Sequence, residues 1–302
     1  MKVLSFTLSF CALALSAQLV CARDTHIETS IECPGVGVLG FPIPITHTVR
    51  NTSRDLPHWM FHMDAATETD GWYAKGILVL FTAADGTVTK VGQITTGRPD
   101  VEFSPSPPSV LCTGGESITR TFDMNQLLLK WRPKPGQGLP SAGRYKVQLL
   151  CRHGDAVSEQ HGIALRNPTN AERQYLASLA KQGIKEQWFP AIVTRDNLEL
   201  PPSGDLPEET ALLCDYIAAL RLAVRNPAAA LEAFGARSDW GFYTDPVREL
   251  AYECLVAVHG KNSEQATSKR AELEAAGLTG RLTRLDKDGG LLTRFGTIRQ
   301  SE

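Results

Sequence analysis

The stretch ILVLFTAADGTVTKV, residues 77–91, decides the first half of the fold. A nearly continuous apolar run over residues 77–82 precedes Asp85-Gly86, and a second extended run covers residues 87–91. An Asp-Gly pair between two extended runs is typical of a tight β-hairpin, because these residues tolerate the positive φ that such a turn needs. The stretch therefore predicts an antiparallel hairpin.

Alternation of period two extends this pattern on both sides of the hairpin. Residues 26–33 and 145–151 each place alternate side chains on one apolar face. Residues 41–49 do the same, but Pro42 and Pro44 cannot donate to a ladder, so we expect this strand at a sheet edge or starting as a loop. Roughly seven short strands separated by turn signals predict an antiparallel β-sandwich.

Four short motifs in this half resemble immunoglobulin-like domains of exported proteins. They are Thr48-Val49-Arg50-Asn51-Thr52-Ser53, Gly114-Gly115-Glu116-Ser117-Ile118, Phe122-Asp123-Met124 and Ala142-Gly143-Arg144-Tyr145-Lys146-Val147. The resemblance covers about residues 24–165 and implies an immunoglobulin-like sandwich. It implies no particular function, because such modules serve as spacers, binders and enzyme appendages. The buried Trp and inter-sheet disulfide of antibody-type domains have no evident match.

The pattern becomes helical after residue 166. Thr169 and Glu172 form a capping box before an apolar-periodic segment, and Gly183 ends that segment. Further helices are predicted to begin near residues 207, 227, 246 and 263, and the tail over residues 282–295 either folds back or stays mobile. Helices of this length with short connections predict a small helical bundle or two helix-hairpin units.

The first 22 residues are typical of a cleaved signal peptide. Lys2 precedes an apolar run that ends in small residues at Ala22, and the run is too short and too rich in serine for a membrane span. Cleavage after Ala17 is the alternative, and lipid attachment at Cys21 is disfavoured by the bulky Val20 before it. We therefore expect a secreted or periplasmic protein with no transmembrane segment after cleavage. The expected division is 1–22 signal peptide, 24–166 sandwich and 167–302 helical domain.

The bulk composition excludes some classes of partner. The chain is 42% hydrophobic and 21% charged, with a formal net charge of −2. Phosphate-backbone binding requires a basic patch, and membrane-surface binding requires a polybasic block. Neither is present in the sequence, so we expect no nucleic-acid partner and favour another envelope protein as the partner.

Five cysteines follow the predicted signal peptide, and export would permit disulfides between them. They are Cys33, Cys112, Cys151, Cys214 and Cys254. We expect Cys151 to pair with Cys33 or with Cys112, and spacing does not decide which. Cys214 and Cys254 lie beside the apolar stripes of two predicted helices, where a bridge is slightly favoured over two separate core residues.

A single group of residues has metal-ligand chemistry. His58 and His62 stand at i and i+4, with Asp64 two residues later. Two imidazoles and one carboxylate would leave a metal an open position for catalysis. However, the glutamate of the HExxH motif is missing, and an ordinary half-buried strand explains the same residues.

These observations predict an exported, non-catalytic binding or structural protein of the cell envelope, with no cofactor and no assigned catalytic residue. The alternative is a metal-dependent hydrolase whose site contains His58, His62 and Asp64. Metal analysis of the purified protein separates the two hypotheses.

Overall fold

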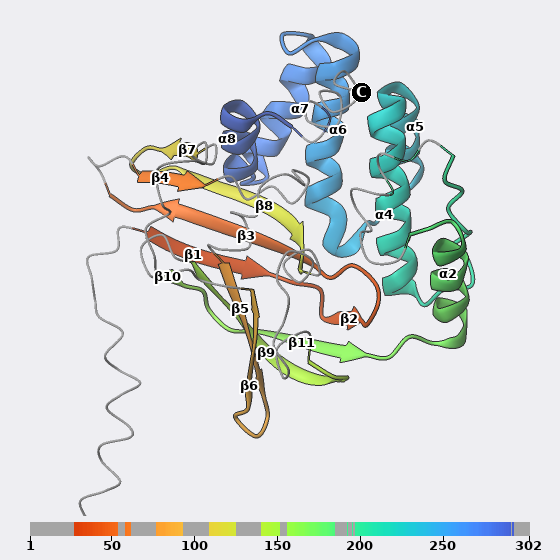
Figure 1. The fold of residues 1–302 in the computed structure, drawn as a ribbon. Helices are drawn as coiled ribbons and strands as arrows, with labels where there is room; N and C mark the ends of the chain where they lie inside the picture. Colours follow the sequence, from red (N-terminus) through yellow and green to blue (C-terminus); the bar gives the residue numbers. More distant parts are fainter. Residues whose placement is uncertain are drawn as a thin grey trace, which may run out of the picture.

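The computed structural model describes residues 27–53, 58–61, 77–92, 109–124, 140–151, 156–184, 192, 195, 197–290 and 292. The predicted signal peptide and Cys21 lie outside these residues. The described part contains antiparallel and mixed sheets toward the N-terminus and helices toward the C-terminus (Figure 1).

The first sheet has three antiparallel strands in the order β1-β3-β8. Their bounds are Ile27–Glu32 for β1, Pro44–Asn51 for β3 and Ser117–Asp123 for β8. Of the two alternatives predicted for this segment, the loop start is the one found: residues 41–43 lie outside the strand, and β3 is not at an edge, because it pairs with a strand on each side. Pro44 is the first residue of β3, where a missing N–H is tolerated.

The second sheet has the order β2-β11-β9-β5-β6, and β10 pairs with β9 beside this path. The bounds are Val36–Val38 (β2), Ile77–Ala83 (β5), Val88–Gly92 (β6), Gly143–Cys151 (β9), Ala156–Val157 (β10) and His161–Arg166 (β11). The predicted hairpin is confirmed, with Gly86 at φ 84° between β5 and β6. The sheet is not wholly antiparallel as predicted, because β2 runs parallel to β11.

One apolar core fills the space between these two sheets. It contains Ile31, Ile45 and Phe122 from the first sheet, and Val79 and Leu149 from the second. All five side chains are buried. The alternating apolar residues of each strand therefore meet face to face, which is the packing that a sandwich requires. A separate pair of strands, β4 (His58–Phe61) and β7 (Ser109–Cys112), is also antiparallel.

Six α-helices follow in the described residues. They are α2 (Asn170–Lys181), α4 (Glu208–Arg225), α5 (Pro227–Ala236), α6 (Thr244–His259), α7 (Glu264–Ala275) and α8 (Thr279–Asp288). The predicted capping box at Thr169 and Glu172 is confirmed, and Gly183 follows α2 with φ 82°. The first turn of α4 carries Glu208 and Glu209, whose charge favours the positive end of the helix.

Helix α8 is an addition to what the sequence predicted, since most of it falls in the segment taken as a tail. It lies over β8 of the first sheet (Figure 1). The approach is close: a Cβ at Gly280 would lie 2.5 Å from Thr119 Oγ1. Only glycine fits there without displacing the sheet.

The sheets and the helices share a second apolar core. Val38 at the end of β2 and Phe41, between β2 and β3, belong to the same buried cluster as Leu179 and Ile217 of the helices. The Phe41 ring stacks on Tyr175 of α2, with 5.9 Å between centroids. In the described residues, no helix has both the length and the apolar character needed to cross a membrane.

Candidate functional site

The structure does not test the predicted metal site. His58 opens β4, where its backbone lies opposite Cys112 of β7. His62 and Asp64 lie outside the described residues. Within the residues that the structure does describe, no group of three or more His, Cys, Asp or Glu could hold a metal. The triad therefore stays a prediction.

The predicted disulfides are not present among the described cysteines. Cys33, Cys112, Cys214 and Cys254 are all free thiols. The predicted bridge between α4 and α6 is wrong because the Cys214 thiol bonds instead with Tyr175 of α2. Burial raises the pKa of Cys214 and of Cys254 to about 12, so both behave as inert core residues. Cys151 ends β9, and its side chain is outside the description.

The most heavily charged buried region lies where α6 and α8 meet the first sheet. We call Glu249, Glu253, Arg281 and Arg284 the charged interface. Their side chains are 5–7% exposed. Arg281 Nη1 donates to Glu249 Oε2 at 2.7 Å, and Arg284 donates to Glu249 Oε1. Arg284 also lies 3.6 Å from Glu253 Oε1.

The charged interface reaches the sheet through Arg281. Its Nη2 lies 3.4 Å from Thr46 Oγ1 on β3 and 3.3 Å from Thr121 Oγ1 on β8. Burial lowers the pKa of Arg281, and its hydrogen bond to Glu249 offsets only part of the loss of water. Glu253 in turn accepts a hydrogen bond from the backbone N–H of Leu292, at 2.9 Å. Two acids and two arginines therefore join sheet, helices and tail.

This arrangement holds the parts together and leaves little chemistry for a substrate. A catalytic acid or base must reach a reacting atom. Here the carboxylates and guanidinium groups bond to one another, and all four residues are buried. We therefore interpret the charged interface as a structural joint.

A second buried polar pair lies on neighbouring strands of the first sheet. His47 on β3 stands opposite Arg120 on β8, and both side chains are buried. Thr29 Oγ1 lies 2.5 Å from His47 Nε2. Burial and the charge of Arg120 lower the pKa of His47 to about 3, so the imidazole is neutral at physiological pH.

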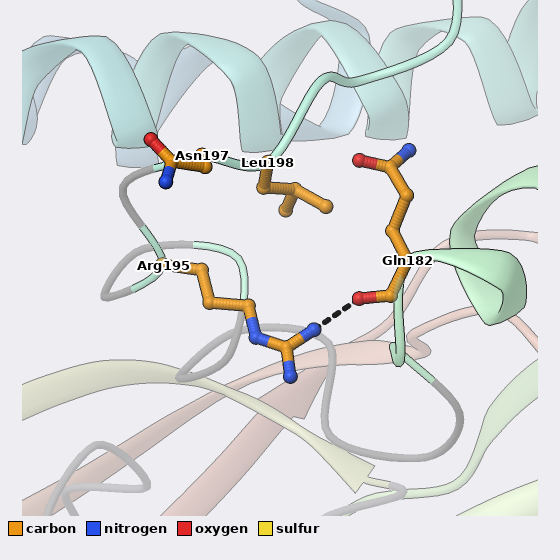
Figure 2. A pocket seen from close by; sticks show the side chains of 4 residues that line it. All are labelled: Gln182, Arg195, Asn197 and Leu198. Atoms are coloured by element: carbon orange, nitrogen blue, oxygen red, sulfur yellow. Dashed lines mark hydrogen bonds between the residues drawn. The ribbon is translucent and has the colours of Figure 1, made fainter.

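An open cavity of about 380 Å³ lies beside the C-terminal end of α2 (Figure 2). It is lined by Gln182, Arg195, Asn197 and Leu198. Arg195 donates to the backbone carbonyl of Gln182. The cavity combines a cation, two carboxamides and an apolar side chain, which is a set able to orient a small polar ligand.

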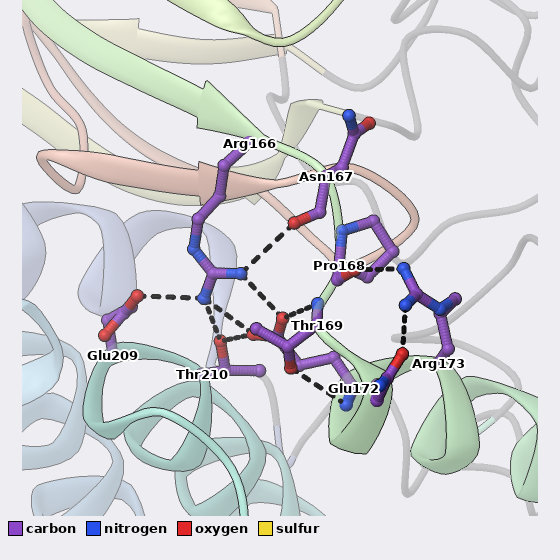
Figure 3. A network of polar contacts seen from close by, with 9 residues as sticks. Arg166, Asn167, Pro168, Thr169, Glu172, Arg173, Glu209 and Thr210 are labelled. Carbon is purple, nitrogen blue, oxygen red and sulfur yellow. Dashed lines mark hydrogen bonds and ion pairs between the residues drawn. The ribbon is translucent and has the colours of Figure 1, made fainter.

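A third network lies at the junction where the last strand leads into the helices (Figure 3). Arg166 at the end of β11 makes two hydrogen bonds to Glu172, at 2.6 and 2.7 Å, and one to Glu209 at 2.9 Å. Thr210 donates to Glu172. Burial acts to raise the pKa of Glu172, and the bonds from Arg166, Thr210 and Thr169 outweigh it and lower the pKa to about 2. We call Arg166, Glu172, Glu209 and Thr210 the Arg166 network.

Sequence reasoning did not find the charged interface. A signal exists, since Glu249 and Glu253 stand at i and i+4, and Arg281 and Arg284 at i and i+3. Such spacing places each pair on one helix face. It does not show that the two faces meet, because surface helices carry the same spacing.

Comparison with known proteins leaves the family open. No family model and no curated protein matches the sequence. Among solved structures, a β-glucosidase from Listeria innocua is 15% identical, with a TM-score of 0.26, over 46% of this chain and 16% of that chain. The CARDB domain of a Pyrococcus furiosus protein, solved with di-metal ions, is 11% identical over 46% of this chain and 87% of that domain, with a TM-score of 0.22.

A further match is the alkylpurine DNA glycosylase AlkC of Pseudomonas fluorescens, solved on DNA with an abasic site analog. It is 14% identical over 51% of this chain and 33% of that chain, with a TM-score of 0.24. The chain thus spans 16% of the length of the β-glucosidase. Scores this low carry no argument about fold or function.

Proposed function

We propose that this protein is an exported, non-catalytic binding or structural protein of the cell envelope. Its two parts are an immunoglobulin-like sandwich and a helical unit. The observation that carries the proposal is the charged interface, whose four buried ionisable side chains bond to one another across the boundary between sheet and helices. Buried ion pairs at this boundary hold the sheets and the helices in one fixed arrangement. A rigid protein of this kind is suited to binding a partner through its surface.

The strand order supports the immunoglobulin-like part of the proposal. The orders β1-β3-β8 and β11-β9-β5 are those of strands A-B-E and G-F-C in such sandwiches. Tyr145, near the start of β9, donates its hydroxyl to the carbonyl of Ser141 at 2.9 Å. A tyrosine near the start of strand F that bonds to the backbone a few residues upstream is the tyrosine corner of this fold.

Export rests on the sequence pattern of residues 1–22 alone. It is tested by fractionating native cells and reading the N-terminus of the mature protein by mass spectrometry. The proposal expects the protein outside the cytoplasm, with cleavage after Ala22 or after Ala17. An uncleaved chain in the cytoplasm would contradict it.

The non-catalytic role is tested against the hydrolase alternative by metal analysis of protein purified from its own envelope. The proposal expects less than one equivalent of any transition metal, and no change in metal content in His62→Ala. The matched control is His161→Ala on β11, a histidine outside the predicted triad. One bound equivalent that His62→Ala loses and His161→Ala keeps would overturn the proposal in favour of the metal site.

A further inference from the structure

We propose that the cavity of Gln182, Arg195, Asn197 and Leu198 binds a small organic carboxylate (Figure 2). This site goes beyond the proposed structural role and does not depend on it. Three features of the cavity support binding: a fixed wall, a cation at the end of α2, and a volume that suits a small molecule.

The wall of the cavity is fixed from two helices. Gln182, which follows α2, donates from Nε2 to the carbonyl of Glu199 at 2.8 Å and accepts from its N–H at Oε1, at 3.0 Å. Arg221 of α4 donates to the carbonyl of Leu198 at 2.7 Å. Arg225, one turn later, donates to the carbonyl of Arg195. Because side chains from α2 and α4 hold this backbone, a ligand would find the site already formed.

The cation lies against the end of α2 because residue 183 is glycine. A Cβ at Gly183 would lie 2.8 Å from Arg195 Nη1, and the backbone there has φ +82°. Arg195 Nη1 donates to the carbonyl of Gln182. A guanidinium carries five N–H donors, and the bond to Gln182 uses one of them.

The lining favours an organic carboxylate over inorganic phosphate, because a guanidinium pairs with either anion but the apolar Leu198 can contact only a carbon chain. None of the four described lining residues is acidic, and Arg195 is the charged one among them. A guanidinium presents two parallel N–H groups that match the two oxygens of a carboxylate. The Asn197 amide adds a further donor, and Leu198 offers an apolar surface to a short carbon chain. A cavity of about 380 Å³ lies within the size range of small-molecule sites.

The test is a titration of the full chain followed by ¹H–¹⁵N NMR shifts of the Gln182 and Asn197 side-chain amides. The probes are propionate and succinate, with propionamide as the uncharged control and inorganic phosphate as the competing anion. The proposal expects saturable shifts with either carboxylate and at least tenfold weaker binding of propionamide and phosphate.

Two variants locate the binding. Arg195→Gln is expected to weaken the carboxylate at least tenfold, and Asn197→Ala, which leaves the backbone bonds in place, a few-fold. Arg173→Gln, at the other end of α2, is the matched control and is expected to bind normally. The proposal is overturned if neither carboxylate saturates, if phosphate or propionamide binds equally well, or if both variants at the cavity retain full affinity.

Discussion

The charged interface and the Arg166 network join the same two parts of the molecule with the same chemistry, but in different surroundings. At the charged interface, Arg281 and Glu249 are 5% and 7% exposed. In the Arg166 network, Arg166 is 27% exposed and Glu209 is 43% exposed. Removing one partner from a buried pair leaves a charge without water, whereas an exposed partner is rehydrated. We therefore expect the loss of unfolding free energy on removing one partner of an arginine–glutamate pair to depend mainly on how deeply that pair is buried.

The largest effect is expected from Glu249→Ala, which leaves Arg281 and Arg284 facing each other in a buried site. The free energy of unfolding should fall by about 3–5 kcal/mol. Urea denaturation followed by circular dichroism measures it. The double variant Glu249→Met with Arg281→Met removes both charges of one pair and leaves Arg284 near Glu253, so it should be less destabilised than Glu249→Ala. If the double variant were destabilised as much as Glu249→Ala or more, an unpaired buried charge would not be the main cause of the loss.

Acid should destabilise the sandwich through His47. Its pKa is about 3 in the folded protein and about 6.5 in the unfolded chain. The unfolded chain therefore binds more protons between these values, and stability is complete above about pH 6.5 and falls as the pH drops toward 3. The expected loss at pH 5 is about 2 kcal/mol. The variant His47→Gln should lose this part of the pH dependence, and His161→Gln, at a half-buried position on β11, should keep it. An unchanged pH profile in His47→Gln would contradict the assignment.

Within the Arg166 network, the two acids should differ. The side chain of Glu172 is 0% exposed, and Glu172 completes the capping box of α2. We expect Glu172→Ala to cost about 1–2 kcal/mol, since a helix cap and buried hydrogen bonds are lost. Glu209→Ala, its exposed neighbour on the same arginine, should cost less than about 1 kcal/mol. Thermal unfolding of the two variants checks the order, and a reversed order would show that burial is not the deciding factor.

The smallest effect is expected at the outer surface of α7 and α8. Asp286 pairs with Arg270 at 2.7 Å and with Lys261 at 3.0 Å, and all three side chains are at least 31% exposed. Asp286→Asn should cost about 0.2–1 kcal/mol, and the cost should shrink in high salt because exposed charges are screened. A loss of unfolding free energy above about 2 kcal/mol that does not change with salt would show that this pair behaves like the buried pairs of the charged interface.

Local signals in the sequence predicted local structure well. Asp85-Gly86 predicted the hairpin, and Thr169 with Glu172 predicted the start of α2, because each depends on residues adjacent in sequence. For β3 the two prolines predicted a loop start or an edge position, and the loop start is found; a proline at the first position of a strand does not show whether a neighbour pairs beyond it.

Features that depend on distant residues were missed. Helix α8 is strongly polar, and its two buried arginines donate hydrogen bonds to Glu249, which lies more than thirty residues earlier in the sequence. The parallel pairing of β2 with β11 likewise joins the two ends of the sandwich. The cavity at Arg195 depends on arginines of α4 that bond to the backbone of another segment. No local period encodes such contacts.

We expect the charged interface to make the sheets and helices one cooperative unit. Native-state hydrogen exchange across a urea series tests it most directly, by comparing amides of β3 and β8 with amides of α4 and α6. The account predicts that the opening free energies of both groups converge on one global value, and that Glu249→Ala lowers both together. Opening of α4 and α6 while β3 and β8 stay protected, or a Glu249→Ala effect confined to the helices, would contradict it.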